Sequence, residues 1–127
     1  LPRDLQNIIL TTKVISSYGK NDSANFETED KLYLLSSEEV FGDFATSSMA
    51  GHDTSVGTSR QLDYYKNQGV TTSSYAGAKK QYNGSNSYWW LRSAYSGNTS
   101  EFLCVLGNGG WFYTDASGGV SPAFRIA

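Results

Sequence analysis

The chain has almost none of the residues on which common catalytic and metal sites depend. It contains one cysteine, Cys104, and one histidine, His52, in 127 residues. A lone cysteine excludes an internal disulfide, so the core must supply the stability by itself. Structural zinc sites need several Cys and His ligands, and a catalytic triad needs a base beside its nucleophile. The only histidine lies in a segment that we expect to be a surface loop.

Other catalytic patterns are also missing. Cys104 lies in the middle of a predicted strand, where a buried thiol is inert, and a nucleophilic role is the minority interpretation. The carboxylates of Glu27, Glu29 and Asp30 are of the type that binds calcium, but they lack the spacing of a calcium loop, so we interpret them as solvated. The glycines form no phosphate-binding motif. The sequence therefore predicts no catalytic residues, no metal site and no cofactor, and hence a protein that is not an enzyme.

Basic charge is scarce, and long apolar runs are absent. Ten basic and twelve acidic residues give a net charge of -2, which does not indicate nucleic-acid binding. The adjacent Lys79 and Lys80 are typical of a solvated turn. No stretch approaches the roughly 18 to 20 apolar residues of a membrane span, so we expect no membrane insertion. The length predicts a single domain over residues 1–127, and the start at Leu1 suggests an excised or processed domain.

Tryptophan and the residues Ser, Gly, Asn and Tyr are concentrated in the C-terminal third. Residues 83–127 hold only four of the 22 charged residues but all three tryptophans. Within residues 83–119, 20 of 37 residues are Ser, Gly, Asn or Tyr. This composition is typical of antibody-like binding surfaces, in which Tyr and Trp supply contact area and the small polar residues supply adaptable hydrogen bonds. A Gly-rich loop region packed by its own aromatic side chains would have the same composition, and both interpretations stay open here.

The N-terminal part predicts short elements. Pro2 suits a first helical turn, and Leu5 and Ile8 follow at helical spacing. The β-branched residues 11–15 favour an extended chain, whereas residues 16–30 are polar and resemble a loop.

A second set of signals follows from residue 31 onward. Residues 31–35 are apolar and predict a buried strand. Ser36 and Glu39 form a capping-box pattern, so we expect a helix that ends by Gly42. Residues 43–57 have no regular pattern.

The middle of the chain predicts one further helix and a loop. Ser59 is a candidate N-cap for a helix over residues 60–68, with Leu62 and Tyr65 facing inward. Residues 70–87 resemble a long loop.

The C-terminal part has the signals of a small antiparallel sheet. The Asn-Gly pair within residues 107–110 is a strong hairpin signal, because it tolerates the positive φ angles of tight turns. The predicted strands cover residues 87–92, 101–106, 111–114 and 122–126. Helices early and strands late indicate an α+β fold.

Three consecutive aromatic residues, Trp111, Phe112 and Tyr113, lie in one predicted strand. Successive side chains of a strand point to opposite faces, so at least one of these rings must face away from the core. An exposed aromatic cluster is typical of a binding surface.

Two stretches resemble a known family. The segment Asp30-Lys-Leu-Tyr-Leu-Leu-Ser-Ser-Glu-Glu-Val-Phe-Gly42, and Trp89-Trp-Leu-Arg-Ser93 followed by Gly119-Val-Ser-Pro-Ala-Phe-Arg-Ile126, resemble the signature of a bacterial domain family of uncharacterised function. That family recurs in secreted and surface proteins of gut Gram-positive bacteria and their phages. It looks related to the C-type-lectin-like fold of formylglycine-generating enzymes and of the variable proteins of diversity-generating retroelements. Ser121 stands where the family usually has arginine.

The resemblance implies a C-type-lectin-like α+β fold with short N-terminal helices, a small twisted antiparallel sheet and long loops. Formylglycine-type catalysis uses a pair of cysteines, which this chain lacks. Trp89 or Trp90, Leu91, Arg92, Pro122 and Phe124 would form the scaffold. An arginine in a strand beside tryptophans is more often a buried hydrogen-bond centre or a stacked cation than a ligand-binding residue. The resemblance places the displayed, potentially variable surface in residues 95–117. The candidate ligand-binding residues are Tyr95, Asn98, Glu101, Asn108, Trp111, Phe112, Tyr113 and Asp115.

The resulting hypothesis is an extracellular, cell-surface or phage-particle domain for adhesion or recognition. Its partner would be a protein or glycan ligand on a cell or phage surface. The alternative hypothesis is a structural module of a bacterial surface or phage protein that has no ligand of its own.

Overall fold

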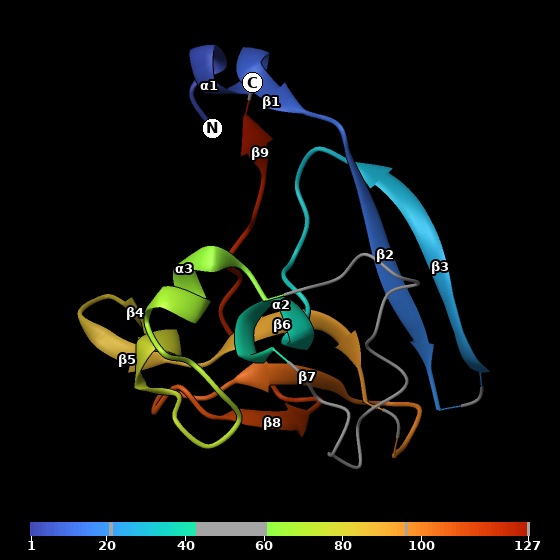
Figure 1. The fold of residues 1–127 in the computed structure, drawn as a ribbon, viewed down its shortest axis with the longest axis vertical. Coiled ribbons are helices and arrows are strands. Elements are labelled where there is room, and N and C mark those ends of the chain that lie inside the picture. The colour runs from blue at the N-terminus through green and yellow to red at the C-terminus, as the bar shows by residue number, and fades with distance from the viewer. Residues whose placement is uncertain (21, 43–60, 96, 127) are drawn as a thin grey trace.

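The computed structural model describes residues 1–20, 22–42, 61–95 and 97–126 (Figure 1). Within these ranges the chain is a mixed α+β protein of short helices and small antiparallel sheets, as the sequence predicts. The predictions for residues 43–57, for His52 and for the Ser59 cap lie outside the described residues.

The two ends of the chain lie at one end of the molecule (Figure 1). Helix α1 (Arg3–Ile8) confirms the predicted N-terminal helix and runs into strand β1 (Ile9–Leu10). Strand β1 pairs antiparallel with β9 (Arg125–Ile126). The predicted strand over residues 122–126 is therefore shorter than expected, although Ala123 also forms a bridge with Tyr33.

Strands β2 (Thr12–Gly19) and β3 (Asp22–Asp30) form a long antiparallel hairpin. The prediction of a loop over residues 16–30 was wrong. Residues 27–29 of β3 are exposed, and polar side chains are accommodated on the solvated side of a two-stranded ribbon. The apolar contribution of the hairpin comes from the buried Val14 and Ile15 in β2.

Helix α2 (Ser37–Phe41) begins with the predicted capping box. The Ser36 hydroxyl accepts a hydrogen bond from the Glu39 amide at 3.1 Å, and the Glu39 carboxylate accepts one from the Ser36 amide at 2.9 Å. Gly42 ends the helix with a φ of 84°.

The segment before α2 was predicted as a buried strand over residues 31–35, and this prediction was wrong. Only Tyr33 makes a bridge, through two hydrogen bonds with Ala123 of 3.1 and 2.7 Å. The carbonyls of Leu34 and Leu35 instead accept hydrogen bonds from Arg92. Leu32 is exposed, so the apolar run forms no continuous buried strand.

Helix α3 (Asp63–Asn67) is shorter than the predicted helix over residues 60–68. Tyr65 is buried, as predicted, whereas Leu62 is exposed. Leu62 occupies the N-cap position with an extended backbone, so its side chain does not follow the inward face of the helix.

Residues 70–87 contain regular structure that the sequence analysis missed. A 3₁₀ turn η1 (Ala76–Ala78) precedes the hairpin of β4 (Lys80–Tyr82) and β5 (Ser85–Ser87). Asn83 and Gly84 form the turn, with φ values of 52° and 81°. The prediction of one long loop was therefore wrong for this part.

The main sheet contains β6 (Trp89–Ala94), β7 (Phe102–Val105) and β8 (Trp111–Thr114), in that order. The predicted turn between β7 and β8 is confirmed by a hydrogen bond from the Leu106 amide to the Gly110 carbonyl. Trp90 and Gly119 are joined by a further backbone hydrogen bond of 3.0 Å, which ties the C-terminal segment to β6.

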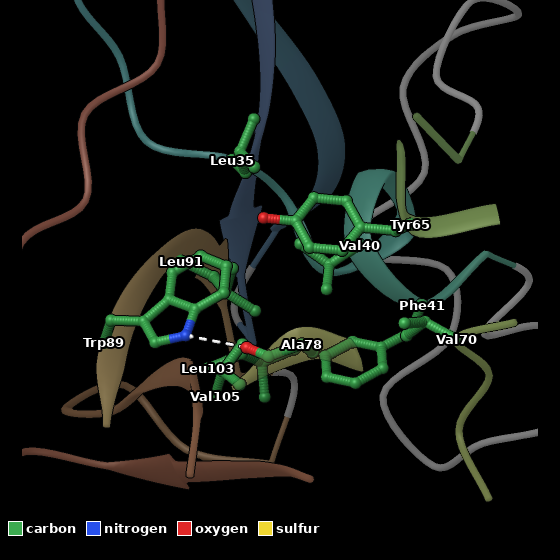
Figure 2. Packing of buried hydrophobic residues seen from close by; sticks show 10 residues of the cluster. All are labelled: Leu35, Val40, Phe41, Tyr65, Val70, Ala78, Trp89, Leu91, Leu103 and Val105. Carbon is green, nitrogen blue, oxygen red and sulfur yellow. Dashed lines mark hydrogen bonds between the residues drawn. The ribbon is translucent and has the colours of Figure 1, made fainter. Parts of the chain in front are cut away.

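The core lies between this sheet and the helices α2 and α3. Figure 2 shows Trp89, Leu91, Leu103 and Val105 of the sheet gathered with residues of α2, α3 and η1. The Trp89 indole donates a hydrogen bond of 3.2 Å to the Ala78 carbonyl inside this cluster. One face of β6 and β7 is thereby covered, and the residues of the other face become the candidates for function.

Candidate functional site

The three consecutive aromatic residues of β8 divide between the two faces of the sheet. Trp111 and Tyr113 are partly buried and pack against the core, whereas Phe112 is 46% exposed. The prediction that at least one of the three rings is exposed is confirmed. Phe112 pairs in register with Cys104, which pairs with Trp90, so these residues cross the sheet in one row.

Tyr95, Phe112 and Tyr113 form a contiguous aromatic group. The rings of Tyr95 and Tyr113 are stacked, with centroids 3.9 Å apart and an interplanar angle of 4°. Phe112 lies 4.7 Å from Tyr113, also stacked. Desolvation and then a hydrogen bond with Tyr113 raise the pKa of Tyr95, so the Tyr95 phenol stays neutral at physiological pH. This group links the end of β6 to β8.

Asn98 and Glu101 organise the loop between β6 and β7. The Asn98 amide group donates to the Glu101 carboxylate, and its oxygen accepts from the Ser100 amide at 3.0 Å. The Tyr95 amide donates to the Glu101 carbonyl at 3.1 Å. These two predicted residues therefore hold the loop together by bonding to each other.

The remaining predicted residues lie at opposite ends of β8. The Asn108 side chain accepts a hydrogen bond of 2.9 Å from the Gly110 amide, inside the turn that precedes β8. Asp115 directly follows β8 and is exposed. The eight predicted residues thus form no single site: five gather around Tyr95, while Asn108 and Trp111 lie near the turn and Asp115 lies at the far end.

A groove of about 750 Å³ lies between the β2–β3 hairpin and the main sheet. Four aromatic side chains line it: Tyr18, Phe26, Trp90 and Phe102. Tyr18 and Phe26 are in contact, with ring centroids 4.7 Å apart, and Tyr18 and Phe102 are 56% and 49% exposed. The polar residues of the lining include Ser16, Ser100, Thr114 and Asp115. We call this space the hairpin groove.

Arg92 also lines the hairpin groove, but its charge is already paired. Its guanidinium donates to the carbonyls of Ile15 at 3.0 Å and Leu34 at 2.9 Å, and to the carboxylate of Glu39. The Arg92 and Glu39 side chains are only 13% and 14% exposed. Arg92 is therefore the buried hydrogen-bond centre that the sequence predicts.

The sequence profile of a family described as a domain of unknown function, DUF6273, matches residues 1–127. The chain belongs to this family. No curated protein and no solved structure matches the chain.

Three further features can be assessed in the described part of this DUF6273 domain: the thiol of Cys104, metal binding and membrane-spanning helices. Cys104 is fully buried, and burial raises the pKa of its thiol to about 11, which leaves it neutral and out of reach of solutes. No three His, Cys, Asp or Glu side chains of the described residues gather closely enough to hold a metal ion. No helix in the same part is long and apolar enough to cross a membrane.

Sequence reasoning missed most of the hairpin groove in the DUF6273 domain. Of the eight predicted residues, Asp115 alone belongs to its lining. Trp90 and Phe102 carried a usable signal, because they alternate with the buried Leu91 and Leu103 along predicted strands. Tyr18 and Phe26 carried none, because they lie in the segment predicted to be a loop.

Proposed function

We propose that this domain is a non-enzymatic recognition domain with a C-type-lectin-like fold, and that it binds a neutral glycan in the hairpin groove. The observation that carries the proposal is the presence of four aromatic side chains around one groove, two of them about half exposed. Ligand sites are commonly concave, mostly apolar and supplied with a few placed polar groups.

The chemistry of the lining suits a sugar ring. A pyranose presents a flat apolar C–H face, which packs on aromatic rings, and a rim of hydroxyl groups. Ser16, Ser100 and Thr114 supply hydroxyls, and Asp115 supplies a carboxylate that accepts hydrogen bonds from sugar hydroxyls. A groove of about 750 Å³ has room for a short oligosaccharide segment.

The charges of the lining favour a neutral ligand over an acidic one. Arg92 and Asp115 are the charged residues that line the hairpin groove. Arg92 is neutralised by Glu39, so it offers no free positive charge to an anion, while Asp115 repels one.

The proposed location is extracellular, on a cell surface or a phage particle, as the family resemblance implies. The potentially variable residues 95–117 border the hairpin groove through Ser100, Phe102, Thr114 and Asp115. Sequence variation in this interval would therefore alter glycan choice while the β2–β3 wall stays constant.

A glycan array tests the proposal with the intact chain. We expect binding to a set of neutral glycans that is lost in Phe102→Ser and Tyr18→Ser. Tyr64→Ser is the matched control, because Tyr64 is 62% exposed and lies in α3, outside the groove lining. All three variants should keep the Tm within a few degrees of the unmodified chain.

Three results would contradict the proposal. An array without hits would favour the alternative hypothesis, a structural module that has no ligand of its own. Equal loss of binding in Tyr64→Ser would place the ligand elsewhere, and selective capture of an unglycosylated protein would replace the glycan with a protein ligand.

A further inference from the structure

A second groove, of about 700 Å³, lies between the β4–β5 hairpin and the C-terminal segment. Its walls include Tyr82 and Tyr88 on one side and residues 117–122 on the other. It shares no lining residue with the hairpin groove. We call it the lysine groove, because Lys80 is the charged residue of its lining.

Lys80 is not the solvated turn residue that the sequence analysis expected. It is half-buried, and its ammonium nitrogen lies 4.9 Å from the centroid of the Trp89 ring. Removal from water lowers the pKa of Lys80, and no opposite charge contributes to raise it. Among the described residues, no carboxylate forms an ion pair with Lys80, and none lines the groove. The aromatic ring attracts the ammonium group less strongly than a carboxylate would.

The rest of the lysine groove is uncharged and mostly apolar. Val120 and Tyr82 are 71% and 72% exposed, and Pro122 lies beside them. Ser117 and Ser121 bring hydroxyl groups that can donate to an oxygen anion. A single cation beside apolar surface, with no competing carboxylate in the lining, is complementary to one negative charge on an apolar body.

We propose that the lysine groove binds a small monocarboxylate, with its carboxylate on the Lys80 ammonium and its apolar body between Tyr82 and Val120. A single ammonium matches the charge of a carboxylate, whereas a dianionic phosphate would need further cations that the lining does not contain. This site is independent of glycan binding, because the two grooves have separate linings.

Phenylacetate is a suitable probe, since it joins one carboxylate to one aromatic ring. In an NMR titration of the ¹⁵N-labelled chain at constant ionic strength, we expect the amides of Lys80, Tyr82, Gly118 and Val120 to shift. Phenylacetamide lacks the charge and acetate lacks the ring, so each should bind at least about tenfold more weakly. Binding of phenylacetamide as tight as that of phenylacetate would overturn the proposal.

The adjacent lysines provide a matched pair of variants. Lys80→Met keeps the apolar stem and removes the charge, and it should weaken phenylacetate binding about tenfold or more. Lys79→Met removes an exposed charge at the next position and should change the affinity by less than about twofold. If the two variants weakened binding equally, the attraction would be non-specific, and the proposal would be overturned.

A second measurement covers the case in which Lys80→Met fails to fold. Reductive ¹³C-methylation keeps the lysine charges and reports each lysine in the NMR spectrum. Because an anion stabilises the charged amine, saturating phenylacetate should raise the pKa of Lys80. The methyl signals of Lys79, which is exposed, should not respond to phenylacetate. The phenols of Tyr82 and Tyr88 also line the groove. An unchanged pKa of Lys80 would contradict the proposed contact, whatever the outcome for the hairpin groove.

Discussion

At the scale of single residues, Arg92 connects parts of the chain that are far apart in the sequence. Its partners Glu39, Leu34 and Ile15 are 53, 58 and 77 positions away. The sequence indicated a buried arginine, because it lies beside tryptophans in a strand, but not its partners. Sequence spacing carries no information on contacts at such separations, since only the tertiary fold creates them.

Replacement of Arg92 by methionine should lower the free energy of unfolding by about 3 kcal/mol, because it leaves the Glu39 carboxylate and two carbonyls without their donor in a largely buried site. Urea denaturation measures the change. Lys13→Met is the control: Lys13 pairs with Glu27 at 3.2 Å, but their side chains are 60% and 57% exposed, so the loss should stay below about 1 kcal/mol. Similar losses in both variants would refute the central role of Arg92.

Cys104 yields a prediction on pH. Burial raises the pKa of its thiol from 9.0 to about 11, so the neutral thiol contributes stability that is fully present below pH 9 and is lost as the pH rises through about 11. The free energy of unfolding should therefore fall less steeply between pH 9 and 11 in Cys104→Ala than in the unmodified chain.

At pH 8 a chromogenic disulfide reagent should label the Cys104 thiol only after urea unfolding. Rapid labelling of the native chain would show that the thiol is accessible.

At the scale of elements, local signals predicted α2 and the β7–β8 hairpin well. The capping box and the Asn-Gly turn act over a few residues, so the sequence contains the whole interaction. The β4–β5 hairpin has the same Asn-Gly signal at Asn83 and Gly84, but it lies in a Ser- and Gly-rich stretch that resembles a loop. The β2–β3 hairpin contains no Asn-Gly pair. Its strands are so polar that the sequence does not predict their pairing.

Alanine substitutions at two glycines with similar φ angles distinguish the cost of backbone strain from the cost of steric overlap. Gly84 and Gly109 have φ values of 81° and 92°. A Cβ atom on Gly84 would meet nothing within 4 Å, whereas one on Gly109 would lie 2.1 Å from the Tyr75 carbonyl oxygen. Gly84→Ala should therefore cost about 1 kcal/mol and Gly109→Ala several kcal/mol, measured by urea denaturation. Equal losses would contradict the close packing of the β7–β8 turn on Tyr75.

At the scale of the whole molecule, the α+β composition could be predicted from the sequence, but the hairpin groove could not. One wall comes from residues 16–26 and the other from residues 90–115, so the groove exists only because β2 packs against β6. The three signature segments also meet: Leu35 accepts from the Arg92 amide at 2.9 Å, Ser37 donates to the Ser93 hydroxyl at 2.9 Å, and Tyr33 pairs with Ala123. This framework holds the two walls in place.

The most direct test of glycan recognition is NMR titration of the ¹⁵N-labelled chain with a neutral glycan identified on the array. We expect the Trp90 indole N–H and the amides of Tyr18, Phe26 and Phe102 to shift together in a saturable way. The Trp89 indole, which is buried and bonded to the Ala78 carbonyl, should remain unchanged. Shifts confined to the loop of Asn98 and Glu101, with the Trp90 indole unmoved, would contradict binding in the hairpin groove.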